Sequence, residues 1–177
     1  MTCRAARHQR TSGTVDRVTG QQFLGSAATR LRDAGCEVSS VQLPGGPALA
    51  GHRSRFRLAW MATRLHLFTV MTTVPHVDAS TLQRFSEDSL DYAAATKGAL
   101  RGFQTGVATI AVLVGETVGP DGARFAQEEL VRRFSAFTWP AAVDLATGVT
   151  YSHQGRVVLG GIYAGWMREQ TALALGT

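Results

Sequence analysis

Apolar and polar residues alternate over residues 53–74, and this pattern predicts two neighbouring strands. Arginine occupies every second position from Arg53 to Arg57, and the alternate positions Phe56, Leu58 and Trp60 are large and apolar. A second alternating run begins near Arg64 and ends near Val74. Because successive side chains of a strand point to opposite faces, each run should have one buried and one exposed face.

A turn at residues 62–63 would fix how these two strands pair. It would set Trp60 opposite Leu65 and Leu58 opposite Leu67, so that large apolar side chains meet on one face. Ala-Thr lacks the usual two-residue turn chemistry, so a longer loop stays open. We therefore predict that Leu58, Trp60 and Leu67 face the core. Arg55 and Arg57 should point away from it.

Four segments carry apolar residues at helical spacing, namely 20–34, 79–98, 121–134 and 161–174. Thr19 is a suitable N-cap for the first, and Gly35 supplies the left-handed residue that often ends a helix. Ser80 and Gln83 fit a capping box at the second. Pro120 suits the first turn of the third.

The remaining apolar runs read as strands at 38–43, 107–114, 139–145, 149–152 and, more weakly, 156–159. Residues 107–114 contain no charge and many β-branched side chains, which is typical of a strand buried on both faces. The order is α-β-β-β-α-β-α-β-β-(β)-α. It predicts an α+β fold with a mixed, largely antiparallel sheet and helices packed on it. A doubly wound parallel fold is the alternative.

Length and composition indicate one domain preceded by a leader. The chain has 177 residues, of which 45% are hydrophobic, so residues 20–177 should form a single α+β domain. Residues 1–19 are polar and basic and should be a disordered leader. No apolar stretch follows the N-terminal arginines, so we expect no signal peptide. No apolar run reaches membrane-spanning length, and the two cysteines suggest no disulfide framework. A cytoplasmic location is expected.

The net charge of +5 is unevenly distributed along the chain, since residues 1–17 alone carry a surplus of three positive charges. The rest of the chain is nearly neutral, which gives little support to nucleic-acid binding. Lys97 is the only lysine among 18 basic residues. Codon bias in a GC-rich bacterial genome explains this arginine preference, and so would recognition of anions.

The arginine-bearing strand is the candidate binding site. The proposed pairing gathers five cationic or titratable side chains on one face: Arg53, Arg55, Arg57, Arg64 and His66. Guanidinium groups match phosphate and carboxylate, so the face could bind an anionic ligand or an acidic protein. A plain solvent-exposed face, screened by Glu87, Asp88 or Asp91, is the competing interpretation.

Catalytic and cofactor motifs are missing from the sequence. There is no Gly-x-Ser-x-Gly, no phosphate-binding glycine loop and no Cys/His spacing that suits zinc, so we expect neither metal nor cofactor. The sequence therefore favours a cytoplasmic binding or interaction protein without catalytic activity. Two alternatives stay open. One is an enzyme with a dispersed site drawn from Arg57, His66, His76 and Asp144. The other is anion or nucleic-acid binding through the leader and the arginine strand.

Overall fold

A seven-stranded sheet runs through the centre of the protein, and four helices pack on it. The computed structural model describes residues 18–60, 63–97, 105–133, 136–155 and 161–177. The helices are α1 (Gly20–Asp33), α2 (Ala79–Lys97), α3 (Pro120–Glu128) and α4 (Gly161–Leu175), with a short 3-10 turn, η1, at Leu58–Trp60. The strands are β1 (Glu37–Leu43), β2 (Gly46–Arg57), β3 (Thr63–Val77), β4 (Thr105–Val118), β5 (Val131–Arg133), β6 (Ala136–Asp144) and β7 (Thr150–Ser152).

The strand order is β1-β2-β3-β4-β6-β5, and β7 also pairs with β6. Four of the six pairings are antiparallel; β3 with β4 and β4 with β6 are parallel. Parallel neighbours need a crossover connection, and α2 and α3 provide the two crossovers. The α+β class, the mixed sheet and the element order predicted from the sequence are confirmed.

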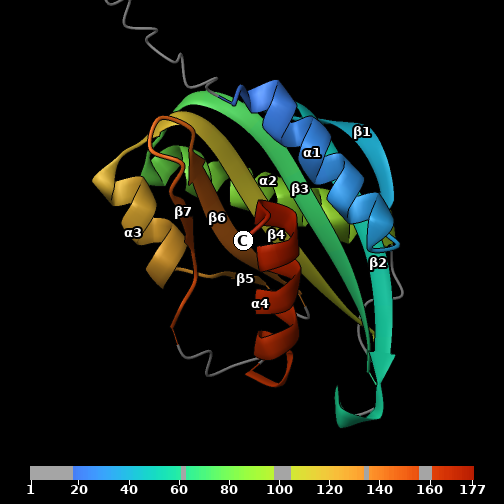
Figure 1. Ribbon diagram of the computed structural model, residues 1–177. Helices are drawn as coiled ribbons and strands as arrows, with labels where there is room; N and C mark the ends of the chain where they lie inside the picture. The colour runs from blue at the N-terminus through green and yellow to red at the C-terminus, as the bar shows by residue number, and fades with distance from the viewer. Residues whose placement is uncertain (1–17, 61–62, 98–104, 134–135, 156–160) are drawn as a thin grey trace, which may run out of the picture.

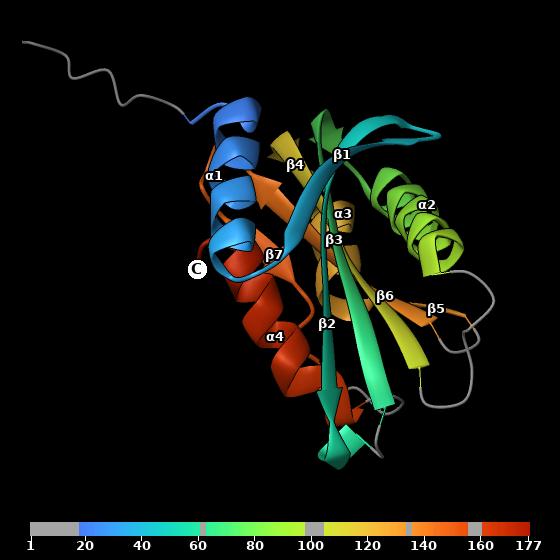
Figure 2. The same cartoon turned by 90° about the vertical axis from the view of Figure 1, so that its right-hand side faces the viewer.

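The helices form one layer on each side of the sheet (Figures 1 and 2). Helices α1 and α4 contact each other and share a core cluster with Leu65, Leu67 and Trp139. Helices α2 and α3 contact each other on the opposite face, over a cluster that includes Phe68 and Leu113. Each helix pair thus covers a separate half of the core.

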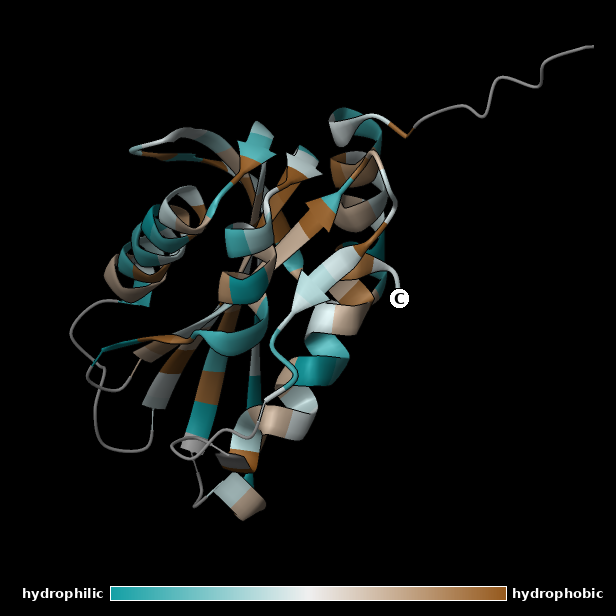
Figure 3. Ribbon diagram, turned by 90° about the vertical axis from the view of Figure 1, so that its left-hand side faces the viewer, coloured by the Kyte–Doolittle hydropathy of each residue, from teal (hydrophilic) through white to brown (hydrophobic). Residues whose placement is uncertain are grey.

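Strand β4 lies at the centre of both clusters. Residues 107–115 of this strand are all buried, which confirms the prediction for the uncharged run 107–114. A strand with a helix layer on each face has no polar side, so its sequence lacks alternation. Figure 3 shows apolar segments along the sheet strands, with hydrophilic segments on the helices and at the strand ends.

Helix α1 begins and ends where the sequence predicts. The Thr19 hydroxyl accepts a hydrogen bond from the Gln22 backbone N–H, and the Gln22 side chain accepts one from Thr19 N–H, which makes a capping box. Gly35 adopts φ 80° just after the helix. At the other end, a Cβ on Gly20 would lie 2.6 Å from Thr73 Cγ2, so glycine allows α1 to rest on β3.

Two helix predictions need correction. Helix α3 ends at Glu128 and not near 134, because Glu129 is extended and residues 131–133 pair with β6 as strand β5. Asp78 caps α2 in place of a Ser80–Gln83 box: its carboxylate accepts hydrogen bonds from the Thr81 N–H (2.7 Å) and the Ser80 hydroxyl (2.8 Å). The predicted strand at 156–159 and residues 1–17 of the predicted leader (1–19) lie outside the described residues, and Thr19 at the end of the predicted leader caps α1.

The predicted pairing of β2 with β3 is wrong by an odd number of residues. Arg55 pairs with Leu65 and Arg53 with Leu67, whereas the sequence pairing set Trp60 opposite Leu65. The chain leaves the sheet after Arg57 and makes one 3-10 turn, so the connection is longer than two residues. An odd shift moves every side chain to the other face. Leu58 lies on the 3-10 turn outside the sheet and is 79% exposed, contrary to the prediction, whereas Trp60 and Leu67 are buried as predicted.

Candidate functional site

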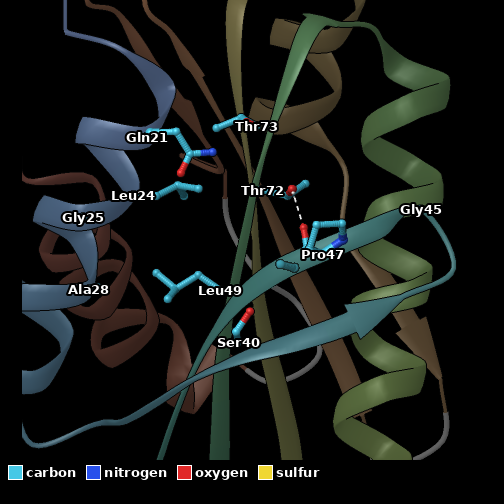
Figure 4. Close-up of a pocket in the computed structure, with 11 residues that line it drawn as sticks. Gln21, Leu24, Gly25, Ala28, Ser40, Gly45, Pro47, Leu49, Thr72 and Thr73 are labelled. Atoms are coloured by element: carbon cyan, nitrogen blue, oxygen red, sulfur yellow. Dashed lines mark hydrogen bonds between the residues drawn. The ribbon is translucent and has the colours of Figure 1, made fainter.

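A cleft of about 590 Å³ lies between α1 and the first three strands (Figure 4). Helix α1 contributes one wall, and the curved β1–β2 hairpin and the end of β3 contribute the other. Its lining combines small apolar and neutral polar side chains: Gln21, Leu24, Gly25, Ala28, Ser40, Gly45, Pro47, Ala48, Leu49, Thr72 and Thr73. The volume falls within the range of about 300–1,000 Å³ that is common for small-molecule sites.

Small residues of α1 leave space on the helix side of this cleft. Gly25 lies in the middle of α1, and a Cβ added there would find no other described atom within 4 Å. Ala28 follows three residues later on the same wall. Glycine inside a helix costs about 0.5–1 kcal/mol relative to alanine, and no close contact with the described residues demands it at this position. Gly25 therefore keeps the cleft wide at some cost in helix stability.

Neutral hydrogen-bonding groups line the strand side. The Thr72 hydroxyl donates a hydrogen bond of 2.9 Å to the Pro47 carbonyl, which ties the end of β3 to the hairpin. Gln21 and Thr73 face each other across the upper part of the cleft in Figure 4. Among the described residues, no acidic or basic side chain belongs to the lining. These features suit an uncharged ligand with an apolar body and a few hydroxyl or carbonyl groups.

A smaller cavity of about 260 Å³ adjoins the cleft at the start of α1. It shares Gln21 and Thr73 with the cleft and adds Val74, Pro75 and Leu145 among its walls. Gln21 therefore stands at the junction of two hollows, where its amide can donate and accept hydrogen bonds.

The structure divides the five predicted site residues between the two faces of the sheet. Arg53, Arg55 and Arg57 share the α4 face, because they pair with residues 67, 65 and 63. Arg64 and His66 pair with Phe56 and Ser54 and lie on the α2 face. The acids of α2 also lie on that second face, so Glu87, Asp88 and Asp91 do not screen the three arginines.

Two of the three arginines contact the protein itself. Arg53 donates a 2.8 Å hydrogen bond to the Gln170 side chain of α4. The Arg57 guanidinium lies 5.1 Å from the centre of the Trp60 ring, within cation–π range. Arg55 is exposed. Whether this face binds a partner stays a prediction.

His66 belongs to a stacked histidine pair. Its ring lies parallel to that of His52, with centroids 5.5 Å apart and a 3.2 Å contact between His52 Nε2 and His66 Nδ1. His52 also stacks on Phe68. Burial, Lys97 and the neighbouring His52 lower the pKa of His66 to about 4, with a further contribution from Arg64. Both rings are therefore neutral at pH 7.

The histidine pair predicts a loss of stability in mild acid. Since the pKa of His66 is about 4 in the folded protein and about 6.5 in an unfolded chain, the unfolded state binds more protons between these values. The contribution of His66 to the free energy of unfolding should be fully present above pH 6.5 and should be lost as the pH falls toward 4. Thermal melts should show this decline, and His66→Gln should reduce it. An identical decline in the variant would contradict the assignment.

His76 and the carboxylates at the far end of β3 have structural contacts. His76 Nδ1 lies 2.8 Å from the Thr117 hydroxyl oxygen on the neighbouring strand β4. The backbone N–H of Thr81 and the side chain of Ser80 lower the pKa of Asp78 to about 2, as its capping role requires. Asp121 accepts a hydrogen bond from the Ala79 N–H, which lowers its pKa and joins α3 to the start of α2.

Asp144 holds together two loops at this edge. It is buried, and its carboxylate accepts hydrogen bonds from the Val118 N–H (3.0 Å) and the Thr147 N–H (2.9 Å). Burial alone would raise the pKa of Asp144, but hydrogen bonds from the Thr147 and Val118 backbone outweigh burial and the net shift is downward. The Asp144 side chain thus remains ionised and stabilises the turn after β6 through its hydrogen bonds.

The four residues considered for a dispersed active site do not meet. Arg57 and His66 lie near the start of β3, on opposite faces. His76 is ten residues further along the same strand, about 33 Å away at 3.3 Å per residue. Asp144 lies with His76 at the far edge of the sheet. None of the four lines the cleft or the cavity beside it.

Sequence reasoning missed the cleft because its residues form no motif. Small and neutral side chains from four separate segments make the walls, and each is ordinary in its own segment. The one feature of the sequence that could have indicated the cleft is Gly25, a glycine inside an otherwise regular helix where no close contact with the described residues requires it.

Among the residues that the structure describes, no three His, Cys, Asp or Glu side chains gather to hold a metal. Nor does any helix within the described ranges have the length and apolarity to cross a membrane. Comparison of the chain with protein-family models, curated proteins and solved structures finds no match.

Proposed function

We propose that the protein is a binding protein without catalytic activity, and that it takes a small uncharged ligand in the cleft between α1 and β1–β3. The observation that carries the proposal is Gly25. A glycine in mid-helix sits on the wall of a hollow of about 590 Å³, with no described atom near enough to require it. An alanine or leucine there would favour the helix and narrow the cleft.

The chemistry of the lining supports the ligand class. Leu24 and Leu49 offer apolar surface on opposite walls, while Gln21, Ser40 and Thr73 offer neutral donors and acceptors. A charged ligand would lose hydration in this cleft without gaining an opposite charge. A compact molecule with an apolar body and one or two hydroxyl or carbonyl groups fits these conditions.

Gly25→Leu is expected to abolish ligand binding while raising the free energy of unfolding by about 0.5–1 kcal/mol. Its side chain would enter the cleft from α1, and leucine is a better helix former than glycine. Binding is measured by protein-detected NMR with a panel of small uncharged fragments that bear hydroxyl or carbonyl groups. Shifts should map to the lining residues of the parent protein only.

Gly165→Leu is the matched control. Gly165 also lies in mid-helix, on α4, and a Cβ there would find no described atom within 4 Å. This variant should gain similar helix stability and bind the fragments as the parent does. Fragments that bind Gly25→Leu unchanged, or that shift residues elsewhere, would refute the proposal.

We also propose that the protein works in the cytoplasm. Cys36 is a buried free thiol, which a reducing compartment preserves. Burial raises the pKa of this thiol, more than the nearby Arg53 lowers it, so the group is poorly reactive.

Binding of an acidic protein at the end of β2 is a second candidate. Arg55 is exposed there on the α4 face, Phe56 is 50% exposed on the opposite face, and Leu58 on the following 3-10 turn is 79% exposed. Exposed apolar side chains next to arginine are a feature of protein-binding surfaces. Arg53 and Arg57 already contact Gln170 and Trp60. Among the described arginines of β2, Arg55 is therefore the one whose guanidinium could bind a partner at this surface.

A further inference from the structure

A second pocket, of about 210 Å³, lies between α4 and the strands β6 and β7. Polar side chains on its wall include Ser152, His153, Gln154, Arg168 and Thr171. We propose that this pocket is an anion site, in which Arg168 and His153 bind the carboxylate of a small organic acid. It is separate from the cleft on α1 and does not depend on the function proposed there.

His153 is buried without hydrogen-bond partners. Its exposed fraction is 5%, and neither Nδ1 nor Nε2 has a partner within the described structure. Buried polar atoms in folded proteins are nearly always satisfied, so a side chain with two unsatisfied nitrogens in a pocket wall indicates a missing partner. An anion would accept a hydrogen bond from the ring.

The imidazole is held in place although its nitrogens are free. The Trp139 ring meets it edge-on, with centroids 5.4 Å apart and planes at 72°. A Cβ at Gly155 would lie 3.1 Å from Nε2 and Cε1, which is tighter than most side-chain contacts, so glycine eases the close approach of the chain to the ring. The ring orientation is therefore fixed before a ligand arrives, which lowers the cost of binding.

Arg168 supplies a positive charge with no acidic partner among the described residues. One of its Nη atoms donates a 2.8 Å hydrogen bond to the Gly155 carbonyl, which anchors the guanidinium at the pocket. Within the described part of the chain, the contacts between basic and acidic side chains join other residues, namely Arg133 to Asp91 and the neutral His52 ring to Glu37. The remaining N–H groups of the fork suit a carboxylate.

The charges around His153 make binding depend on pH. Burial and Arg168 on α4 lower its pKa, and Arg132 on β5 adds to this. The Gln127 backbone on α3 and the charge of Glu129 act in the opposite direction without cancelling the shift. An anion beside the ring would raise the pKa, since an opposite charge favours the protonated form. Binding should therefore take up protons and strengthen as the pH falls.

The apolar part of the lining favours an organic acid over inorganic phosphate. Trp139, Ala172 and Leu175 complete the wall and offer surface to a short hydrocarbon chain. At roughly 30 Å³ per water molecule, the pocket holds the equivalent of about seven waters. That space suits a monocarboxylate of a few carbons, and butyrate is the natural probe.

The test follows the His153 ring signals by NMR in the whole chain while butyrate is added. A Kd on the order of 1 mM is expected for so small a ligand, tightening at least about threefold between pH 7.5 and pH 6. Arg168→Gln should weaken binding about tenfold or more, and Arg168→Lys by less, because lysine keeps the charge but loses the fork. Arg124→Gln, a change of an exposed arginine on α3, should leave the Kd unchanged.

Three results would overturn the proposal. One is the absence of any His153 shift at about 10 mM butyrate, ten times the expected Kd. Another is equal loss of affinity in Arg124→Gln and Arg168→Gln, which would indicate a general charge effect. The last is tighter binding of inorganic phosphate than of butyrate, which would exclude the carboxylate class. Thermal melts of each variant verify that the fold is retained.

Discussion

Leu67→Ala should lower the free energy of unfolding by about 2–5 kcal/mol, whereas Leu58→Ala should change it by no more than about 0.5 kcal/mol. Leu67 is 1% exposed and packs in the cluster between the sheet, α1 and α4. Leu58 is 79% exposed on the 3-10 turn after β2. Urea unfolding curves with a common slope would measure both changes.

Leu58 is the residue that decides between the two strand pairings. The pairing expected from the alternation alone buries both leucines, and it predicts a large cost for each. The observed pairing of Arg53 with Leu67 leaves Leu58 outside the sheet. A cost of several kcal/mol for Leu58→Ala would restore the sequence-based pairing.

Gly122→Ala should destabilise the protein by about 1–3 kcal/mol or more, although alanine is the better helix former. A Cβ at this position of α3 would lie 2.6 Å from the Val77 carbonyl oxygen and 3.3 Å from the Asp78 carbonyl carbon. These are backbone atoms, and Val77 O already accepts a 2.9 Å hydrogen bond from Gly119 N–H. The helix would have to move away from the junction of β3 and α2.

Gly165→Ala provides the comparison for this substitution. Gly165 lies in α4, and the methyl group of an alanine there would find no described atom within 4 Å of its carbon. The change should therefore stabilise the protein by about 0.5–1 kcal/mol. Opposite signs at the two glycines are expected in thermal or chemical unfolding. Two changes of equal sign and size would mean that α3 does not approach β3 as closely as described.

Elements whose signal is local were predictable from the sequence. Helix α1 carries its own capping box and its own terminal glycine, so nothing distant was needed to find its ends. The central strand β4 was equally clear, because eight uncharged residues rich in β-branched types suit only a strand enclosed on both faces. In both segments the structure that the local pattern predicts is also the one that the surrounding fold requires.

The predicted pairing of β2 with β3 was wrong because alternation identifies two faces but not which of them is covered. Arginine can extend its aliphatic stem over apolar groups while its charge reaches water or a partner. Arg57 does this over Trp60, and Arg53 reaches α4, so the arginine side of β2 is the side that meets a helix. The large apolar residues Phe56 and Leu58 are left outside.

The candidate sites were less predictable, since tertiary contacts create them. Ser-His-Gln-Gly at 152–155 has the composition of a turn, and nothing local indicates that His153 is buried. Its burial comes from Trp139 on β6 and from α4, more than ten residues away in either direction. The cleft beside Gly25 likewise exists only when α1 is set against the β1–β2 hairpin.

The central position of β4 has a consequence for the order of folding. It pairs with β3 and β6, each reached through a helical crossover, so no hairpin within the chain can shelter it early. During synthesis, the uncharged segment 107–114 leaves the ribosome before β6 and stays unpaired on that side until β6 follows. Exposed apolar strands of this kind favour aggregation. Pairing with β6 therefore ends the interval in which one edge of this apolar segment is exposed.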